Sequence, residues 1–137
     1  MSVGRLATRE EGIIKFSDLD GVKKQLFDGQ ASENALKTFD ILEKEKIVIN
    51  KFIDIGANIG TSSISAYHLK ENLNFLCIEG NKNNFSLLTK NVKLNDVEDK
   101  FKLLNKLVGE KKSTRLFVEF AEEKGCSRVF DNVNELK

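Results

Sequence analysis

The chain has no proline, one histidine and two widely separated cysteines among its 137 residues. The absence of proline excludes every motif that depends on that residue. Cys77, Cys126 and His68 are too few for a four-ligand zinc site. No apolar run approaches the roughly 18 residues of a membrane span, and the N-terminus lacks the apolar core of a signal peptide. We therefore expect no metal site, no membrane association and a reducing, cytoplasmic setting.

The composition is that of one ordinary globular domain. A chain of this size buries roughly two-thirds of its unfolded surface, which is enough for a real core. There are 22 basic and 21 acidic side chains, a formal net charge of +1. This balance gives no reason to expect a nucleic-acid partner. We expect an N-terminal segment over residues 1–31 and the main domain over residues 32–137.

Short apolar segments alternate with amphipathic ones from Ser32 onward. Ser32 is a suitable N-cap, and apolar residues then recur every three or four residues up to a charged run at 43–46. This spacing predicts an amphipathic helix. Two further helices are expected at 61–70 and 81–94. The expected strands cover 52–55, 75–78, 101–108 and 114–120, with the last two joined as a hairpin, and weaker patterns predict a strand near 13–16 and a helix near 22–27.

This order of elements is typical of an α/β fold with a parallel sheet. Right-handed crossovers place the strands 52–55 and 75–78 side by side, with their carboxyl ends at one edge. Both are apolar enough to be read as buried strands. We interpret Cys77 as a core residue of the second strand and His68 as a packing or surface residue of the helix before it.

The turn after the first of these strands carries the main functional signal. Its sequence is Asp54-Ile55-Gly56-Ala57-Asn58-Ile59-Gly60, and small residues there let a ligand approach the backbone at a helix N-terminus. Glu79 follows the second strand, where a carboxylate can accept hydrogen bonds from both hydroxyls of a ribose. Two acids around a glycine loop predict a nucleoside site.

The loop spacing favours S-adenosylmethionine over a nicotinamide dinucleotide. A dinucleotide site needs Gly-x-Gly-x-x-Gly, whereas this loop has Gly-x-x-x-Gly with Asn58 in the middle. A carboxylate at position 54 would repel a pyrophosphate, but it suits the sulfonium and ammonium groups of S-adenosylmethionine. The predicted cofactor-binding residues are Asp54, Gly56, Ala57, Asn58, Gly60, Glu79, Gly80 and Asn81.

Three segments together resemble the FkbM family of methyltransferases. That family has an Asp-x-Gly-Ala-Asn-x-Gly loop, an acid after the second strand, and a helix ending in Asn-x-x-x-Asn, here Asn91 and Asn95. The segments are Phe52–Gly60, Cys77–Asn81 and Asn84–Asn95, and the weaker likeness of Leu104–Gly109, the strand to Phe120 and Gly125–Ser127 extends the resemblance over roughly residues 35–130.

The resemblance implies a Rossmann-like class I methyltransferase sheet and methyl transfer to a hydroxyl of a small molecule or glycan. By it, Asp54, Gly56, Asn58 and Gly60 hold the methionine part of the cofactor and Glu79 the ribose. It names no general base. Asn81 to Asn84 is also expected to cap the following helix.

This chain departs from the family pattern at two places. Gly80 stands where the family usually has proline, and no later strand carries the family's Asp-x-Glu-Gly motif. Residues 131–136 resemble the helix that would precede that strand. The sheet is therefore expected to be incomplete on its C-terminal side, with the strand 52–55 as an apolar edge. We expect either a fragment, which is the favoured interpretation, or a partner chain that covers this edge.

Two other functions stay open on the sequence. One is a non-catalytic remnant that binds the cofactor but lacks the acceptor half. The other is a nicotinamide-binding Rossmann domain, disfavoured by the loop spacing. A nucleic-acid amino-methyltransferase is excluded more firmly, because its Asn/Asp-Pro-Pro-aromatic motif requires proline.

Overall fold

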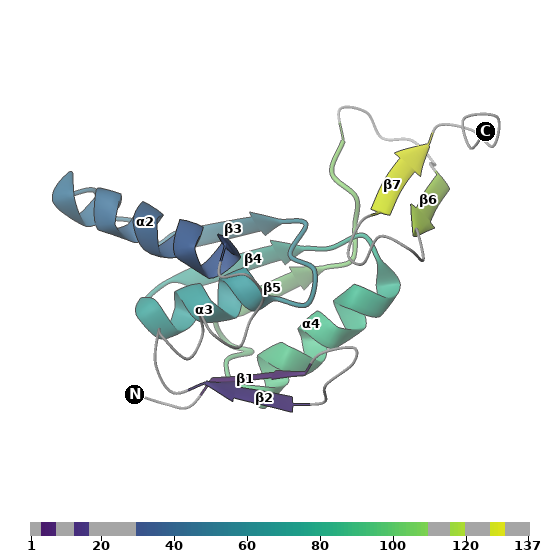
Figure 1. Ribbon diagram of the computed structural model, residues 1–137, viewed down its shortest axis with the longest axis horizontal. Helices are drawn as coiled ribbons and strands as arrows, with labels where there is room; N and C mark the ends of the chain where they lie inside the picture. The colour runs from purple at the N-terminus through teal and green to yellow at the C-terminus, as the bar shows by residue number, and fades with distance from the viewer. Residues whose placement is uncertain (1–3, 8–12, 17–29, 110–115, 120–126, 131–137) are drawn as a thin grey trace.

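The structure is an α/β arrangement with a small parallel sheet at its centre (Figure 1). This computed structural model describes residues 4–7, 13–16, 30–109, 116–119 and 127–130. Within these ranges, the central part contains three helices and three parallel strands. Alternation of apolar strands with amphipathic helices predicted this fold class, and the prediction is confirmed at that level.

The central sheet has the order β3-β4-β5 and all its strands are parallel. Its strands are β3 (Lys51–Ile55), β4 (Asn74–Ile78) and β5 (Phe101–Leu104). The predicted pairing of the first two is confirmed, with Ile55 opposite Ile78. Their arrowheads in Figure 1 point the same way, so the segments that follow β3 and β4 begin at one edge of the sheet.

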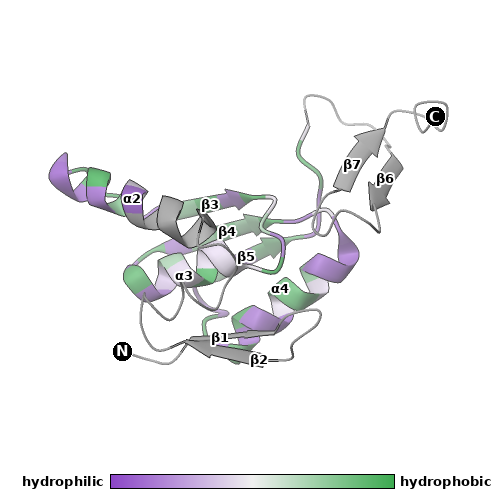
Figure 2. Ribbon diagram, in the orientation of Figure 1, coloured by the Kyte–Doolittle hydropathy of each residue, from purple (hydrophilic) through white to green (hydrophobic). Residues whose placement is uncertain are grey.

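The helices α2 (Gln30–Lys44), α3 (Thr61–Leu69) and α4 (Lys82–Leu94) contribute to one hydrophobic core. Hydrophobic and hydrophilic residues both occur along α4, as Figure 2 shows, and its apolar residues Leu88 and Val92 are buried. The strands contribute alternate residues to the same core, because successive side chains of a strand point to opposite faces. The buried residues that form this core are Phe39, Ala57, Ile64, Ala66, Leu73, Phe75, Cys77, Leu88, Val92, Val97 and Phe101.

A row of phenylalanines crosses the core face of the sheet. Phe52, Phe75 and Phe101 occupy matching register positions on the three strands. The rings of Phe75 and Phe101 stack with centroids 4.5 Å apart, and those of Phe52 and Phe75 are 5.4 Å apart. Tyr67 of α3 meets Phe75 and Phe101 edge-on. These cross-strand aromatic contacts help to fix the register of the strands.

The opposite face of β3 is exposed, which corrects the prediction of a buried strand. Ile53 and Ile55 retain 60% and 62% of their surface exposed. In the described sheet β3 is an edge strand, as expected from the sequence. Parallel sheets are ordinarily covered on both faces, so this apolar surface is unusual.

Several predicted boundaries are wrong. The first helix begins at Gln30, so Ser32 lies inside it and is not its N-cap. The third strand ends at Leu104, and residues 105–109 are irregular. The predicted hairpin is not formed, because β6 (Leu116–Glu119) pairs with β7 (Ser127–Phe130) while β5 pairs with β4. The pattern of short apolar runs does not specify pairing partners, which depend on tertiary contacts.

The remaining strands form an N-terminal ribbon. The predicted strand near 13–16 is confirmed as β2 (Ile13–Phe16), which pairs antiparallel with β1 (Gly4–Ala7). The helix expected near 22–27, Cys126 and the helix expected at 131–136 lie outside the described residues. No helix among the described residues has the length and apolar character needed to cross a bilayer.

The exposure of β3 generates a prediction about stability. Replacing both Ile53 and Ile55 by threonine keeps the β-branched shape and removes no core contact, so each change should alter the free energy of unfolding by no more than about 0.5 kcal/mol. Leu88→Ala, at a fully buried position, should cost about 2–5 kcal/mol. Equilibrium urea denaturation measures the free energy of unfolding of the Ile53/Ile55 double variant and of Leu88→Ala. A loss in the double variant as large as that of Leu88→Ala would show that this face is covered in solution.

Candidate functional site

The predicted site residues gather at the carboxyl edge of β3 and β4. The loop after β3 turns across the end of β4, where the backbone N–H groups of Gly56 and Ala57 both donate to the carbonyl of Ile78, at 2.8 and 3.1 Å. The end of β4 leads directly to Glu79. The structure therefore brings the glycine loop and this acid together, as the parallel pairing predicted.

Three residues of the loop have left-handed backbone conformations. Gly56 has φ +80°, Asn58 has φ +52° and Gly60 has φ +90°. Glycine adopts this region freely, and asparagine is among the few other residues that tolerate it. The three positions with left-handed backbone are therefore occupied by residues that tolerate this conformation. Ala57, between them, is buried in the core rather than presented at the surface.

The two glycines differ in their surroundings. A Cβ atom at Gly56 would meet nothing within 4 Å, so open space lies beside this residue. A Cβ atom at Gly60 would lie 2.6 Å from Cδ1 of Leu88. Gly60 is therefore needed for packing of the α3 N-terminus against α4, whereas the space beside Gly56 is open.

Glu79 holds the loop and the start of α4 together. Its Oε2 atom accepts from the N–H of Asn58 and its Oε1 atom accepts from the N–H of Asn81, both at 2.8 Å. The residue is only 8% exposed. Hydrogen bonds of this kind between N–H groups and a carboxylate are stronger than neutral ones, and they offset the cost of burying the charge. The sequence predicted a ligand-binding acid, and the structure adds this bracing role.

Asparagine side chains fasten the neighbouring backbone. Asn81 is the N-cap of α4, as expected, because its Oδ1 accepts from the N–H groups of Asn83 and Asn84 at 2.8 and 3.0 Å. Asn105, just after β5, donates from Nδ2 to the carbonyls of Glu79 and Gly80 at 2.7 and 3.2 Å.

The helix α4 also holds the far end of the loop. Asn91 is fully buried and donates from Nδ2 to the carbonyl of Ile59 at 2.8 Å. Asn95 donates from Nδ2 to the carbonyl of Asn91, and its Oδ1 lies 3.3 Å from Nε2 of His68. His68 also packs edge-on against Tyr67 at the C-terminal end of α3, which fits its interpretation as a packing residue. The resemblance singled out Asn91 and Asn95, and these contacts give each a structural role.

Asp54 lies on the core side of β3 and is hydrogen-bonded within the protein. Its Oδ2 atom accepts from the hydroxyl of Ser63 at 2.6 Å, and Oγ of Ser63 accepts from the thiol of Cys77 at 3.2 Å. Burial raises the pKa of Asp54, the Ser63 hydrogen bond opposes that rise, and the charge of Glu79 adds to it. The charge of Glu79 therefore acts on Asp54 through space.

The sequence missed Ser63 and Asn105. The rule that polar residues after parallel strands share one edge also applies to Asn105, which follows the third strand directly. Ser63 had a weaker signal, since it is one of several small polar residues in an otherwise apolar helix. Its contact with Asp54 depends on how α3 packs on the sheet.

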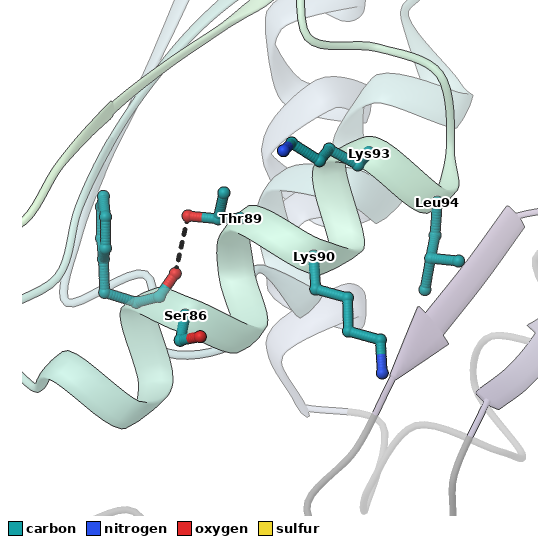
Figure 3. Close-up of a pocket in the computed structure, with 6 residues that line it drawn as sticks. Ser86, Thr89, Lys90, Lys93 and Leu94 are labelled. Atoms are coloured by element: carbon teal, nitrogen blue, oxygen red, sulfur yellow. Dashed lines mark hydrogen bonds between the residues drawn. The ribbon is translucent and has the colours of Figure 1, made fainter.

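A hollow of about 590 Å³ lies elsewhere, on α4 (Figure 3). It is lined by Phe85, Ser86, Thr89, Lys90, Lys93 and Leu94. α4 contacts β1, and none of the predicted site residues lines this hollow. We place the candidate site at the loop, because the acids and left-handed glycines are there. Across the described residues, no group of three or more histidine, cysteine or acidic side chains is arranged to hold a metal ion.

Comparison with known proteins adds no assignment: no protein-family model matches the chain, and no curated protein matches it significantly.

The glycine geometry predicts unequal effects of two matched substitutions. Gly56→Ala and Gly60→Ala impose a similar left-handed strain, of roughly 1–2 kcal/mol. Only the alanine at position 60 meets Leu88, so this variant should lose a further increment, of about 1–3 kcal/mol. Thermal or urea unfolding of the two variants tests the difference. Equal losses would contradict the tight contact between the loop and α4.

Proposed function

We propose that this protein is an S-adenosylmethionine-dependent methyltransferase with a Rossmann-like class I sheet, in which the glycine loop after β3 binds the cofactor. The resemblance to the FkbM family suggests methyl transfer to a hydroxyl of a small molecule or glycan. The single observation that carries the proposal is the pair of acids, Asp54 and Glu79, on either side of a left-handed glycine loop with open space at Gly56.

The charge at the loop supports a cationic ligand. Asp54 and Glu79 are close enough for the charge of Glu79 to raise the pKa of Asp54. A pyrophosphate placed here would meet two carboxylates. It would also find the N–H of Asn58 already engaged by Glu79. S-adenosylmethionine has no phosphate and carries sulfonium and ammonium groups, so these acids favour it.

The residues present fit this cofactor. The space at Gly56 allows the ligand to approach the backbone. Each Glu79 oxygen uses one of its two acceptor positions for a backbone N–H, which leaves the second for a ribose hydroxyl. When bound, the cofactor would supply a sulfonium-activated methyl group for transfer to an acceptor oxygen. The contribution of these residues is to bind and orient the ligand, and no general base is assigned.

The direct test is calorimetric titration of the chain with S-adenosylmethionine, with NAD as the parallel ligand. Binding of S-adenosylmethionine alone supports the proposal. Binding of NAD alone would favour the nicotinamide-binding alternative. Binding of neither ligand to a chain that gives a folded circular-dichroism spectrum would contradict the assignment of this loop.

Glu79→Ala should weaken S-adenosylmethionine binding by about tenfold or more, because it removes hydrogen bonds to a charged group. Glu98→Ala changes an exposed acid outside the site and serves as the control. Since Glu79 also braces the loop, affinity alone does not separate the two roles. S-adenosylhomocysteine and its 2′,3′-dideoxy analogue separate them in a double-mutant cycle. The native chain should prefer the hydroxylated ligand, and Glu79→Ala should lose that preference; a retained preference would rule out the ribose contact.

A further inference from the structure

A hydrogen-bonded chain of three polar side chains ends at the half-buried Asp54. The thiol of Cys77 on β4 donates to Oγ of Ser63 on α3, and the hydroxyl of Ser63 donates to Oδ2 of Asp54 on β3. Ser63 and Cys77 are both completely buried. The chain therefore joins three elements at the point where the loop begins.

The hydrogen bonds of this chain all run toward Asp54. An ionised carboxylate only accepts, so the single proton of the Ser63 hydroxyl must point to it. The Ser63 oxygen is then left to accept, and the Cys77 thiol is the donor that reaches it. Burial raises the pKa of Cys77 to about 12, so this thiol keeps its proton throughout the neutral range. The direction of the chain is thus maintained.

We propose that Ser63 is a positioning residue that keeps Asp54 ionised and aimed at the cationic part of the ligand, with Cys77 fixing the direction of the Ser63 hydroxyl. This inference rests on the proposed function, since it describes how the site prepares a carboxylate for a cation. Neither residue touches the ligand in this role.

The electrostatics around Asp54 support the need for such a residue. Burial and the Glu79 carboxylate, at the end of β4, both raise the pKa of Asp54. The Ser63 hydroxyl, from α3, lowers it, and Cys77 acts through that hydroxyl. Removing the hydroxyl leaves the two raising influences unopposed. Asp54 would then take up a proton at a higher pH and lose its attraction for a cation there.

The test compares Ser63→Ala with Ser65→Ala. Ser65 is a matched control because it lies on the same helix, is 2% exposed, and has a hydroxyl without a hydrogen-bond partner. S-adenosylmethionine affinity is measured over a pH series from 4 to 8. In Ser63→Ala the acidic fall in affinity should begin at a higher pH than in the native chain. At low pH the loss should approach about tenfold for each unit by which the midpoint moves. Ser65→Ala should follow the native profile.

A ligand-free measurement keeps this inference separate from the proposed function. Carbon-13 NMR titration of the Asp54 carboxyl reports its ionisation directly, and Ser63→Ala should shift its midpoint to higher pH. The same midpoint in the two proteins would overturn the inference, whether or not S-adenosylmethionine binds. A shifted midpoint without any binding of S-adenosylmethionine would support the control of Asp54 by Ser63 and overturn its use for this ligand.

Cys77 is tested by a pair of variants at one position. Cys77→Ser keeps a hydrogen-bond donor to Ser63, whereas Cys77→Ala removes it. Both substitutions leave a small space of similar size in the core. The midpoint of Asp54 should stay near the native value in the serine variant and move to higher pH in the alanine variant. Equal Asp54 midpoints in the two variants would show that the Cys77 thiol has no influence on Asp54.

Discussion

The edge of the sheet depends on one buried carboxylate. Glu79 accepts from Asn58 in the loop and from Asn81 at the start of α4, and it stands directly after β4. A charge so little exposed is costly unless its oxygens are hydrogen-bonded, and two backbone donors meet that need. Because these donors come from different parts of the chain, satisfying the charge also fixes the loop against the helix. The first donor, the N–H of Asn58, belongs to a residue with left-handed backbone.

Around this brace, side-chain amides hold main-chain groups in place. Asn91 reaches the carbonyl of Ile59 from α4, and Asn105 reaches the carbonyls of Glu79 and Gly80 from the end of β5. These contacts give the loop a defined shape before any ligand arrives, so a ligand need not supply the free energy of ordering it. Asp54 receives comparable support from Ser63 and Cys77. The candidate site is therefore held in shape by hydrogen bonds from residues outside the loop itself.

The two faces of the central sheet differ in how far they are covered. One face packs on three helices through the row of Phe52, Phe75 and Phe101, while Ile53 and Ile55 on the other face of β3 remain largely exposed. Both patterns look alike in the sequence, since an apolar strand of a parallel sheet reads as continuous hydrophobicity. Exposure here depends on which elements cover each face, and the alternation of burial along β3 reveals it.

Local patterns in the sequence determined the α/β class, the positions of α3, β4 and α4 to within a residue or two, and the gathering of Asp54, Gly56 and Glu79 at one edge. Apolar periodicity, glycine and strand-end acids carry that information within short stretches. Only the tertiary structure decided that β6 pairs with β7, that Ile53 is exposed, and that Ser63 and Asn105 support the candidate site. Each of these depends on groups distant in sequence meeting at hydrogen-bond or van der Waals range, and no periodicity within a single segment encodes such a meeting.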